Sequence, residues 1–274
     1  RYAEPLMQPK EPQFDNFDTS AEDICLIAFT SGTSGEVKGT MHHHRDLMVT
    51  ADCLPRTTMP SGPEDVFVSN MPLSEAFGLS TLILFPMRVG ASAILLQQFE
   101  PKILMQAITK LKATICCSSP ASYRVMLDYT KKYDVSGLTT CISTGEMLSA
   151  SLSNQWHNLT GSTIIDAFGS TELLGRVIAS PLDELRPGAT GKPVEGYLCR
   201  VVDESYRDIP TGMTGRLIVK GPTGCRYLAG ENQTDYVKNG WNITGDLYSI
   251  DADGFYWFGG RMNDIIDNGG YEIV

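Results

Sequence analysis

The stretch "FTSGTSGEVKG" (residues 29–39) decides how the rest of the chain is interpreted. It contains three glycines, two serines and two threonines, followed by a single lysine, Lys38. Glycines let a backbone approach a ligand closely, and successive N–H groups can surround phosphate oxygens. The stretch is therefore either a phosphate-binding loop or a solvated turn, and its flanks must distinguish the two.

The flanks favour a loop between a strand and a helix. "DICLIAFT" (residues 23–30) is a continuous apolar run, as expected of a buried parallel strand. "HHRDLMVTADCL" (residues 43–54) has helical spacing and should end at Pro55. Open α/β sheets bind ligands at such strand-to-helix turns. The loop matches neither the Walker pattern nor the GxGxxG pattern.

Strands and helices alternate along the next part of the chain. The strand candidates are residues 65–70, 91–96, 113–118, 139–144 and 162–168. The helix candidates are residues 101–112, with Pro101 in the first turn, 120–132 and 149–159. This alternation predicts an α/β fold built on a parallel sheet.

The sequence pattern changes near residue 191. From there on, no segment has clear helical periodicity, and short strand candidates are separated by Gly and Asp turns. These candidates are residues 197–203, 215–221, 245–251 and 254–260. We therefore expect two units, an α/β core in residues 1–190 and a β-rich subdomain in residues 191–274. The first twenty residues have few periodic apolar positions and suggest an arm or linker.

Composition narrows the class of protein. The chain has 274 residues with 22 Lys and Arg against 32 Asp and Glu, a formal charge of −10, so we expect no nucleic-acid partner and no binding to anionic membranes. The apolar stretch 79–96 is interrupted by Pro86, Arg88 and Gly90, which predicts a helix followed by a strand and not a membrane span.

Seven cysteines without a CxxC pair indicate reduced thiols in a cytoplasmic protein. The chain opens with Arg1, so we expect a fragment or a processed product.

Three further motifs follow the glycine loop. They are "FGSTE" (168–172), "WNITGD" (241–246) and "GGRMNDIIDNGGYEI" (259–273). In this order and spacing, the four motifs resemble those of the adenylate-forming superfamily, which includes acyl-CoA synthetases, peptide-synthetase adenylation domains and firefly luciferase. The loop departs from the family pattern at Val37, where proline is usual.

Two longer segments resemble the aryl-CoA ligases of the benzoate and 2-aminobenzoate type. They are "GRLIVKGPTGCRYL" (215–228) and "DGFYWFGGRMNDII" (253–266). The resemblance implies the layered parallel α/β sheets of the family's N-terminal domain, followed by a β-rich distorted barrel. It also implies a reaction in which an aromatic carboxylate attacks the α-phosphorus of ATP, expels pyrophosphate and is then transferred to coenzyme A. Mg²⁺ would accompany ATP, and a homodimer is an open alternative.

The resemblance assigns roles to individual residues. The nucleotide-binding set is Thr30, Ser31, Gly32, Thr33, Ser34, Gly35, Lys38, Gly145, Glu146, Asp166, Phe168, Gly169, Ser170, Thr171, Asp246 and Arg261. Thr171, Glu172 and Lys38 would be catalytic, Glu172 would ligate Mg²⁺, and Asp246 would accept hydrogen bonds from both ribose hydroxyls. Each residue also has a purely structural alternative without ligand binding. Glu172 would be a solvated carboxylate, Asp246 a turn residue and Arg261 part of a surface ion pair, and the segments near residues 145 and 166 would serve core packing.

The acyl pocket is where the sequence departs from its relatives. The expected wall is Ala76, Phe77, Gly78, Gly169 and Gly175. Ser74 and Glu75 replace a Phe-His pair that is frequent in acyl-CoA synthetases, and the Phe-Asp pair typical of amino-acid activation is absent. After Glu172 the chain has Leu-Leu-Gly where aryl ligases tend to have Met-Leu-His, which would enlarge the pocket.

A run of three histidines and a pair of adjacent cysteines are both expected to have structural roles. The three histidines at 42–44 point in different directions and lack a fourth ligand, so a helix start is favoured over a metal site. Cys116 and Cys117 lie in an apolar strand and are expected to be inert core thiols.

Functions other than that of a complete CoA ligase stay open. The family's C-terminal lid domain, with its catalytic lysine, would follow a hinge near Asn263, and we expect it to be absent from this chain. The alternatives are a nucleotide-binding core or degenerate binding module without turnover, and transfer of the acyl group to a carrier-protein thiol.

Overall fold

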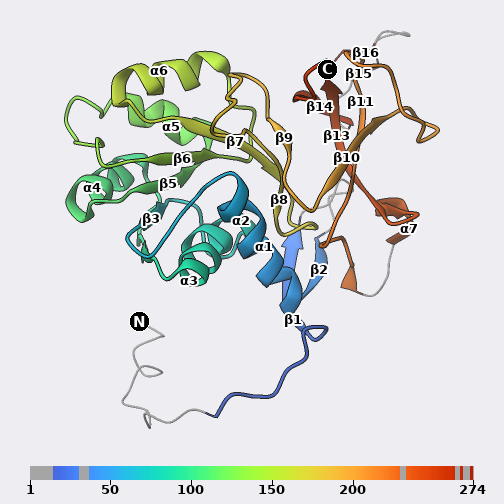
Figure 1. Cartoon of the computed structure of the whole chain (residues 1–274), viewed down its shortest axis with the longest axis horizontal. Coiled ribbons are helices and arrows are strands. Elements are labelled where there is room, and N and C mark those ends of the chain that lie inside the picture. Colours follow the sequence, from blue (N-terminus) through green and yellow to red (C-terminus); the bar gives the residue numbers. More distant parts are fainter. Residues whose placement is uncertain (1–14, 31–36, 229–232, 263–265, 268–271, 274) are drawn as a thin grey trace.

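The computed structural model describes residues 15–30, 37–228, 233–262, 266–267 and 272–273. Figure 1 shows a helix-covered sheet beside a second, curled sheet. The second sheet lies against the edge of the first at which β8 and β9 are found. The fold is therefore α/β with a β-rich second part, as the sequence predicts.

The first sheet is mixed. Its order is β4 (Ser92–Ile94), β3 (Val66–Ser69), β5 (Ile115–Ser118), β6 (Thr140–Ser143), β7 (Ile164–Gly169), β8 (Arg176–Ala179) and β9 (Lys192–Pro193). The strands from β4 to β7 pair in parallel, which confirms the predicted parallel sheet. The pairs β7–β8 and β8–β9 are antiparallel, because the chain turns back directly after β7 instead of crossing over through a helix.

Helices cover both faces of this sheet. One group is α1 (His44–Thr57), α2 (Ala76–Leu79), the π-helical turn η2 (Ser80–Leu84) and α3 (Phe85–Val89). The other is α4 (Pro101–Leu111), α5 (Pro120–Leu127) and α6 (Ala150–Thr160). The Ser119 and Ser149 hydroxyls cap α5 and α6 by accepting a hydrogen bond from a backbone N–H. The predicted helix 120–132 is shorter in the structure, because residues after Leu127 tighten into turns with three-residue spacing.

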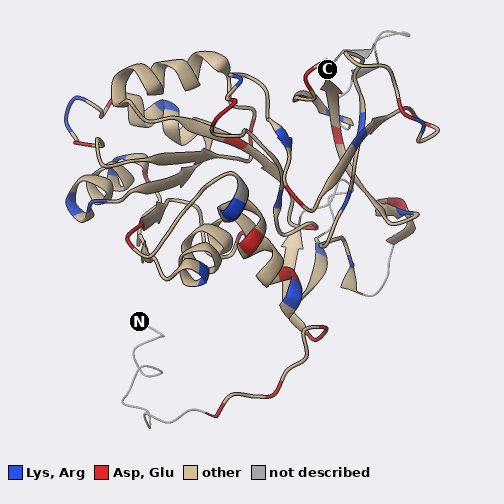
Figure 2. Ribbon diagram, in the orientation of Figure 1, with Lys and Arg blue, Asp and Glu red and all other residues tan. Residues whose placement is uncertain are grey.

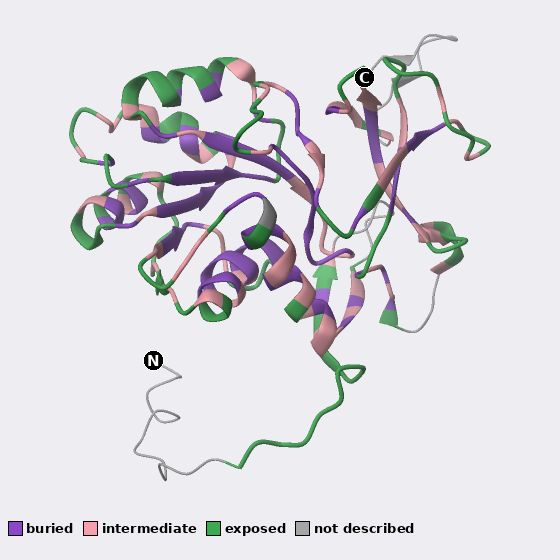
Figure 3. Ribbon diagram, in the orientation of Figure 1, coloured by how far each residue is buried: buried purple, intermediate pink, exposed green. Residues whose placement is uncertain are grey.

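Successive side chains of a strand point to opposite faces of its sheet. The first sheet therefore contributes to two buried hydrophobic clusters, one on each face. On β5, Cys116 packs with Tyr123 and Trp156 beneath α4–α6, whereas Ile115 and Cys117 join the core beneath α1–α3. Burial raises the pKa of both cysteine thiols, which fits the expectation of inert core residues. Figure 3 shows the buried residues concentrated along these central strands.

The second sheet is antiparallel. Its strands are β10 (Leu198–Val202), β11 (Gly215–Lys220), β13 (Trp241–Ile250), β12 (Val237–Lys238) and β14 (Tyr256–Arg261), with the short helix α7 (Gln233–Tyr236) before β12 and the pair β15 (Ile266–Asp267) and β16 (Glu272–Ile273) after β14. Val219, Tyr248 and Tyr256 belong to the same buried cluster as Ile178 of the first sheet. The second sheet therefore packs against the hydrophobic cluster that lies beneath α1–α3.

The segment around the glycine loop differs from expectation. The prediction of a buried parallel strand followed by a helix was wrong: β1 (Ile24–Thr30) pairs antiparallel with β2 (Lys38–His43), and α1 begins only after β2. Phe29 on β1 is 69% exposed. An apolar run indicates a strand but does not specify its partner. Helix α1 also continues past Pro55 to Thr57, since a proline so near the helix end disturbs little.

Basic and acidic residues are interspersed along the ribbon (Figure 2). Within the described part of the chain, none of the helices has the length and apolar character that a membrane crossing would require.

Gly191 is a position where only glycine fits. Its φ is +130°, and a Cβ there would lie 2.1 Å from the carbonyl group of Ala179. We expect Gly191→Ala to lower the free energy of unfolding by at least about 2 kcal/mol, because it combines backbone strain with overpacking. Chemical denaturation would measure this. Gly62→Ala, where a Cβ meets nothing within 4 Å, is the matched control; equal stability of the two variants would contradict the expectation.

Candidate active site

A cavity of about 450 Å³ lies where the ends of the parallel strands meet the second sheet. Residues that follow β6 and β7 form one side, and residues of β13 and β14 form another. The start of α2 and the end of β1 complete the wall. The carboxyl edge of a parallel sheet is the usual place for a ligand in such folds.

The cavity brings together most of the predicted site residues that the structure describes. Those that line it are Thr30, Ala76, Phe77, Gly145, Gly169, Ser170, Thr171, Glu172, Asp246 and Arg261. A second hollow of about 90 Å³ shares Gly145, Gly169, Asp246 and Arg261 with it. This second hollow is also lined by Glu146, Asp166 and Phe168. Ser31, Gly32, Thr33, Ser34 and Gly35 lie outside the described residues, as does the predicted hinge at Asn263.

Three predicted residues do not line either hollow. Gly78 packs on backbone, since a Cβ there would lie 1.9 Å from the Pro72 carbonyl oxygen. Gly175 faces the Tyr197 hydroxyl, which would be 3.0 Å from a Cβ. Lys38 points to the aromatic pair described next. Two of the five residues expected to form the acyl wall therefore have packing roles.

Lys38 and Glu172 are connected through two tyrosines. Lys38 Nζ donates a hydrogen bond to the Tyr236 hydroxyl at 2.9 Å and lies 4.7 Å from the centroid of that ring. The rings of Tyr236 and Tyr227 meet edge to face at 4.9 Å. The Tyr227 hydroxyl donates to Glu172 Oε1 at 3.1 Å. The Glu172 carboxylate is thus held at the cavity wall by a chain that begins on β2.

The turn that carries Thr171 and Glu172 is tight. The Ser170 hydroxyl accepts a hydrogen bond from the Leu173 N–H at 3.3 Å, and the Gly175 N–H donates to the Leu173 carbonyl at 2.6 Å. Leu174 has φ +58°, a left-handed conformation that costs a leucine energy. Such strain is common at functional sites, where surrounding packing maintains it.

Asp246 reaches the cavity from β13. Gly245 before it has φ +79°, which glycine adopts without strain. The Asp246 N–H donates to the Thr244 hydroxyl at 3.1 Å, and Arg261 Nε of the neighbouring strand donates to Asp246 Oδ1 at 3.2 Å. The Asp246 side chain is buried, whereas that of Arg261 is largely exposed. One carboxylate oxygen is therefore held while the residue faces the cavity.

Burial perturbs two carboxyl groups here. It raises the pKa of Asp246 from 3.8 to about 6, although Arg261 partly opposes the shift. It also raises the pKa of Asp166, to about 7, against two backbone hydrogen bonds that lower it. Perturbed carboxyl groups in a cleft are typical of ligand-binding and catalytic sites.

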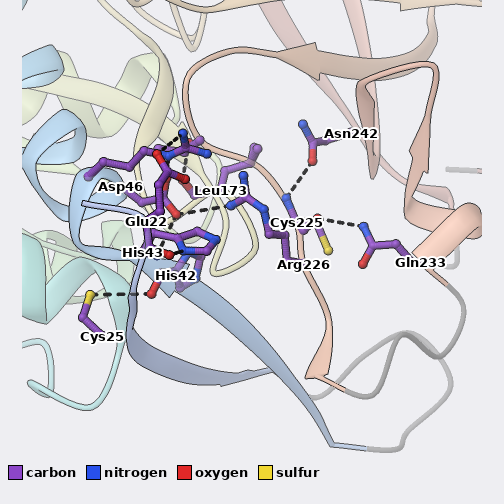
Figure 4. Close-up of polar contacts among 12 residues, drawn as sticks. Glu22, Cys25, His42, His43, Asp46, Leu173, Cys225, Arg226, Gln233 and Asn242 are labelled. Atoms are coloured by element: carbon purple, nitrogen blue, oxygen red, sulfur yellow. Dashed lines mark hydrogen bonds and ion pairs between the residues drawn. The ribbon is translucent and has the colours of Figure 1, made fainter. Parts of the chain in front are cut away.

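A polar network holds the segment that carries Tyr227 (Figure 4). The Cys225 N–H donates to Asn242 Oδ1 at 2.8 Å, and Gln233 Nε2 donates to the Cys225 carbonyl at 2.7 Å. Arg226 Nη1 donates to Asp46 Oδ2 at 3.4 Å, which ties the segment to α1. The segment is therefore tied to α1, α7 and β13 by side-chain hydrogen bonds.

The three histidines separate as expected from their spacing. His42 and His43 end β2, and His44 begins α1. His42 is completely buried, and this burial lowers its pKa. Among the residues that the structure describes, no group of three or more His, Cys, Asp or Glu could hold a metal ion.

Sequence reasoning missed several residues that line the cavity. They include Met71, Thr144, Arg176, Tyr227 and Tyr236. A signal existed for Arg176, since a charged residue inside an otherwise apolar strand of four buried residues needs an explanation. Nothing in local sequence indicates Tyr236, which the fold brings to the cavity from α7.

Comparison with known proteins identifies the family. Residues 3–227 match the family described as AMP-binding enzyme. The chain belongs to this family. It is 32% identical to benzoate–CoA ligase of Thauera aromatica, over 98% of the chain and 52% of that protein. It is 30% identical to human mitochondrial acyl-coenzyme A synthetase ACSM3, over 93% of the chain and 45% of that protein.

Solved structures agree. The fold superposes with a TM-score of 0.90 and 32% identity on an anthranilate CoA ligase in complex with anthranoyl-AMP, covering 95% of this chain and 52% of that one. It superposes with a TM-score of 0.87 and 29% identity on ATP-bound MatB of Rhodopseudomonas palustris, with the same coverage. These matches confirm the predicted membership of the adenylate-forming enzymes. The chain spans about half the length of the curated relatives it matches.

The raised pKa of Asp246 gives this AMP-binding enzyme a testable pH dependence. The folded state holds the Asp246 proton more tightly than the unfolded state, so the stability that this residue contributes is present at low pH. That contribution is lost as the pH rises from about 4 through 6, the folded pKa. We expect Asp246→Asn to be more stable than the parent at pH 8 by up to about 3 kcal/mol, and the gain to shrink toward pH 4.

Denaturant unfolding at pH 4 and pH 8 would measure the change, with the exposed Asp183→Asn as the control. A gain in stability at pH 4 as large as that at pH 8 would contradict the assignment.

Proposed function

We propose that this protein activates a carboxylic acid with ATP, as part of an AMP-forming acid–CoA ligase. The observation that carries the proposal is the convergence of Thr30, Thr171, Glu172, Asp246 and Arg261 on one cavity. These residues come from separate motifs, and the chain belongs to the AMP-binding enzymes. The chemistry needs little covalent participation by the protein and depends on positioning and on charge neutralisation.

In this proposal the nucleotide occupies both hollows. Asp246 accepts hydrogen bonds from the ribose hydroxyls, and Arg261 adds a ribose or phosphate contact. The adenine lies in the smaller hollow between Gly145 and Phe168, whose ring packs edge to face on Tyr248 at 5.5 Å. Thr171 contacts the α-phosphate from the tight turn after β7.

Glu172 fits the role of a Mg²⁺ ligand. Its carboxylate lines the cavity, only Oε1 receives the Tyr227 hydrogen bond, and Mg²⁺ is commonly bound by one or two carboxylates together with substrate phosphates. When bound, the ion would neutralise phosphate charge. Lys38 would hold Tyr236 and Tyr227, and through them the position of Glu172.

The acid would lie at the opposite end of the cavity. Ala76, Phe77, Met71 and Leu173 form an apolar wall there. Such a wall suits a flat ring, and this supports an aromatic acid. Coenzyme A is the proposed acceptor because the similar curated proteins are named as CoA ligases or synthetases. The proposal keeps residues 1–190 as the core and residues 191–274 as the β-rich subdomain, in a cytoplasmic protein.

Acid preference tests the proposed substrate class. We expect benzoate-like acids to raise the melting temperature more than octanoate does, in the presence of ATP and Mg²⁺. Ligand at about 100 times its Kd adds roughly 2.7 kcal/mol of stability. A thermal-shift series over both classes of acid would measure this. A response to aliphatic acids alone would exclude an aromatic substrate.

A pair of variants tests the nucleotide site. Asp246→Ala should weaken ATP binding about a hundredfold or more, since it removes two hydrogen bonds to a charged group, each worth about 1.5–3 kcal/mol. Lys38→Ala should weaken it far less, because Lys38 Nζ donates to the Tyr236 hydroxyl and Lys38 is not one of the residues that line the cavity. Calorimetric titration of both variants would decide; equal losses would refute the assignment of Asp246.

A further inference from the structure

Arg176 is a buried cation in the cavity wall. It lies on β8, it is 6% exposed, and it lines the cavity of about 450 Å³. None of the ion pairs in the described part of the chain includes it. Its Nε is buried without a hydrogen-bond partner. Within the described part of the chain, the fold therefore places a positive charge without an ion-pair partner in the cavity wall.

The side chain is held in one place. Its guanidinium carbon lies 4.5 Å from the centroid of the Phe77 ring, within the range of a cation–π interaction. Arg176 pairs across the sheet with Gly169, and a Cβ on Gly169 would lie 2.4 Å from Arg176 Nη1. The absence of a side chain at position 169 thus makes room for the guanidinium between the phosphate-binding turn and the acyl wall.

The other charged groups of the cavity form no ion pair with Arg176 in the described part of the chain. Asp246 pairs with Arg261, and Glu172 accepts the Tyr227 hydrogen bond. Glu75 is exposed and makes no ion pair among the described residues.

Arg176 itself stays charged. The Cys117 thiol near it is neutral, because burial raises its pKa far above neutrality. Burial lowers the pKa of Arg176 only to about 10, so it is cationic at neutral pH. The charge therefore has no counter-charge among the residues that the structure describes.

An unpaired buried charge destabilises a protein, so its presence at a ligand cavity requires a compensating ligand. A guanidinium offers parallel N–H donors that match both oxygens of a carboxylate. An ammonium or hydroxyl group on a ligand would leave the charge uncompensated. The group that fits Arg176 is therefore an anion, and the Phe77 ring beside it favours an aromatic body next to that anion.

We propose that Arg176 selects acids that carry a second carboxylate, so that the substrate class is an aromatic dicarboxylate. One carboxylate would lie near Thr171, where it is activated, and the other would pair with the guanidinium beside Phe77. This inference rests on the proposed function and specifies its substrate.

Calorimetry tests the inference on the chain as it is. Each acid is titrated in the presence of α,β-methylene-ATP and Mg²⁺: benzoate, benzene-1,3-dicarboxylate and benzene-1,4-dicarboxylate. We expect at least one dicarboxylate to bind about tenfold to a hundredfold more tightly than benzoate, as a charged hydrogen-bonded pair allows. In Arg176→Met this advantage should disappear, while the affinity for benzoate changes less than about threefold.

Two further variants sharpen the test. Arg124→Met, at an exposed position of α5, should leave all affinities unchanged. Arg176→Lys keeps the charge without the planar fork and should retain part of the preference. Arg176→Met should also melt at a higher temperature than the parent, because it removes an unpaired buried charge. If it does not fold, the comparison of benzoate with the dicarboxylates on the parent chain still decides.

The outcomes are distinguishable. Equal binding of benzoate and both dicarboxylates by the parent chain overturns the inference and leaves the proposed function standing. An equal loss of benzoate, dicarboxylate and nucleotide analogue in Arg176→Met shows that Arg176 serves the reacting carboxylate or the phosphates, and also overturns it. If the parent chain binds neither the nucleotide analogue nor any acid, the proposed function fails together with the inference.

Discussion

The backbone pairing between Gly191 and Tyr256 joins the two sheets, and the cavity depends on it. The Tyr256 N–H donates to the Gly191 carbonyl at 2.7 Å, and the Thr190 N–H donates to the Tyr256 carbonyl at 2.9 Å. This junction sets the position of β14 beside the end of the first sheet, and β14 in turn pairs with β13. Through β13, it helps to place Asp246 at the cavity that Glu172 also lines.

The site concentrates features that oppose stability. Leu174 adopts a left-handed conformation, Asp246 and Asp166 are buried carboxyl groups, and Arg176 is a buried cation that forms no ion pair with another described residue. Each would be unfavourable in an ordinary core. Their grouping around one cavity is what a binding site requires, because a ligand can compensate charges that the protein leaves unpaired. The large shared core supplies the stability that tolerates them.

Local groups also overcome the charge of the whole molecule. A chain with a formal charge of −10 repels nucleotides and carboxylates at long range. Arg176 and Arg261 line the cavity, and Lys38 lies behind its tyrosine wall. Because a cavity is poorly screened by solvent, these few cations act more strongly there than surface charges of either sign act elsewhere.

The sequence by itself determined the parallel α/β core, the β-rich second part, the family and the motif residues that converge on the cavity, because these follow from periodicity and from contiguous motifs. It could not determine the partner of β1, since an apolar run does not specify what a strand pairs with. It also assigned Gly78 and Gly175 to the acyl wall, although their packing against Pro72 and Tyr197 depends on contacts distant in sequence. Only the tertiary structure revealed that Arg176 has no ion-pair partner among the residues it describes, because pairing is a property of the assembled site.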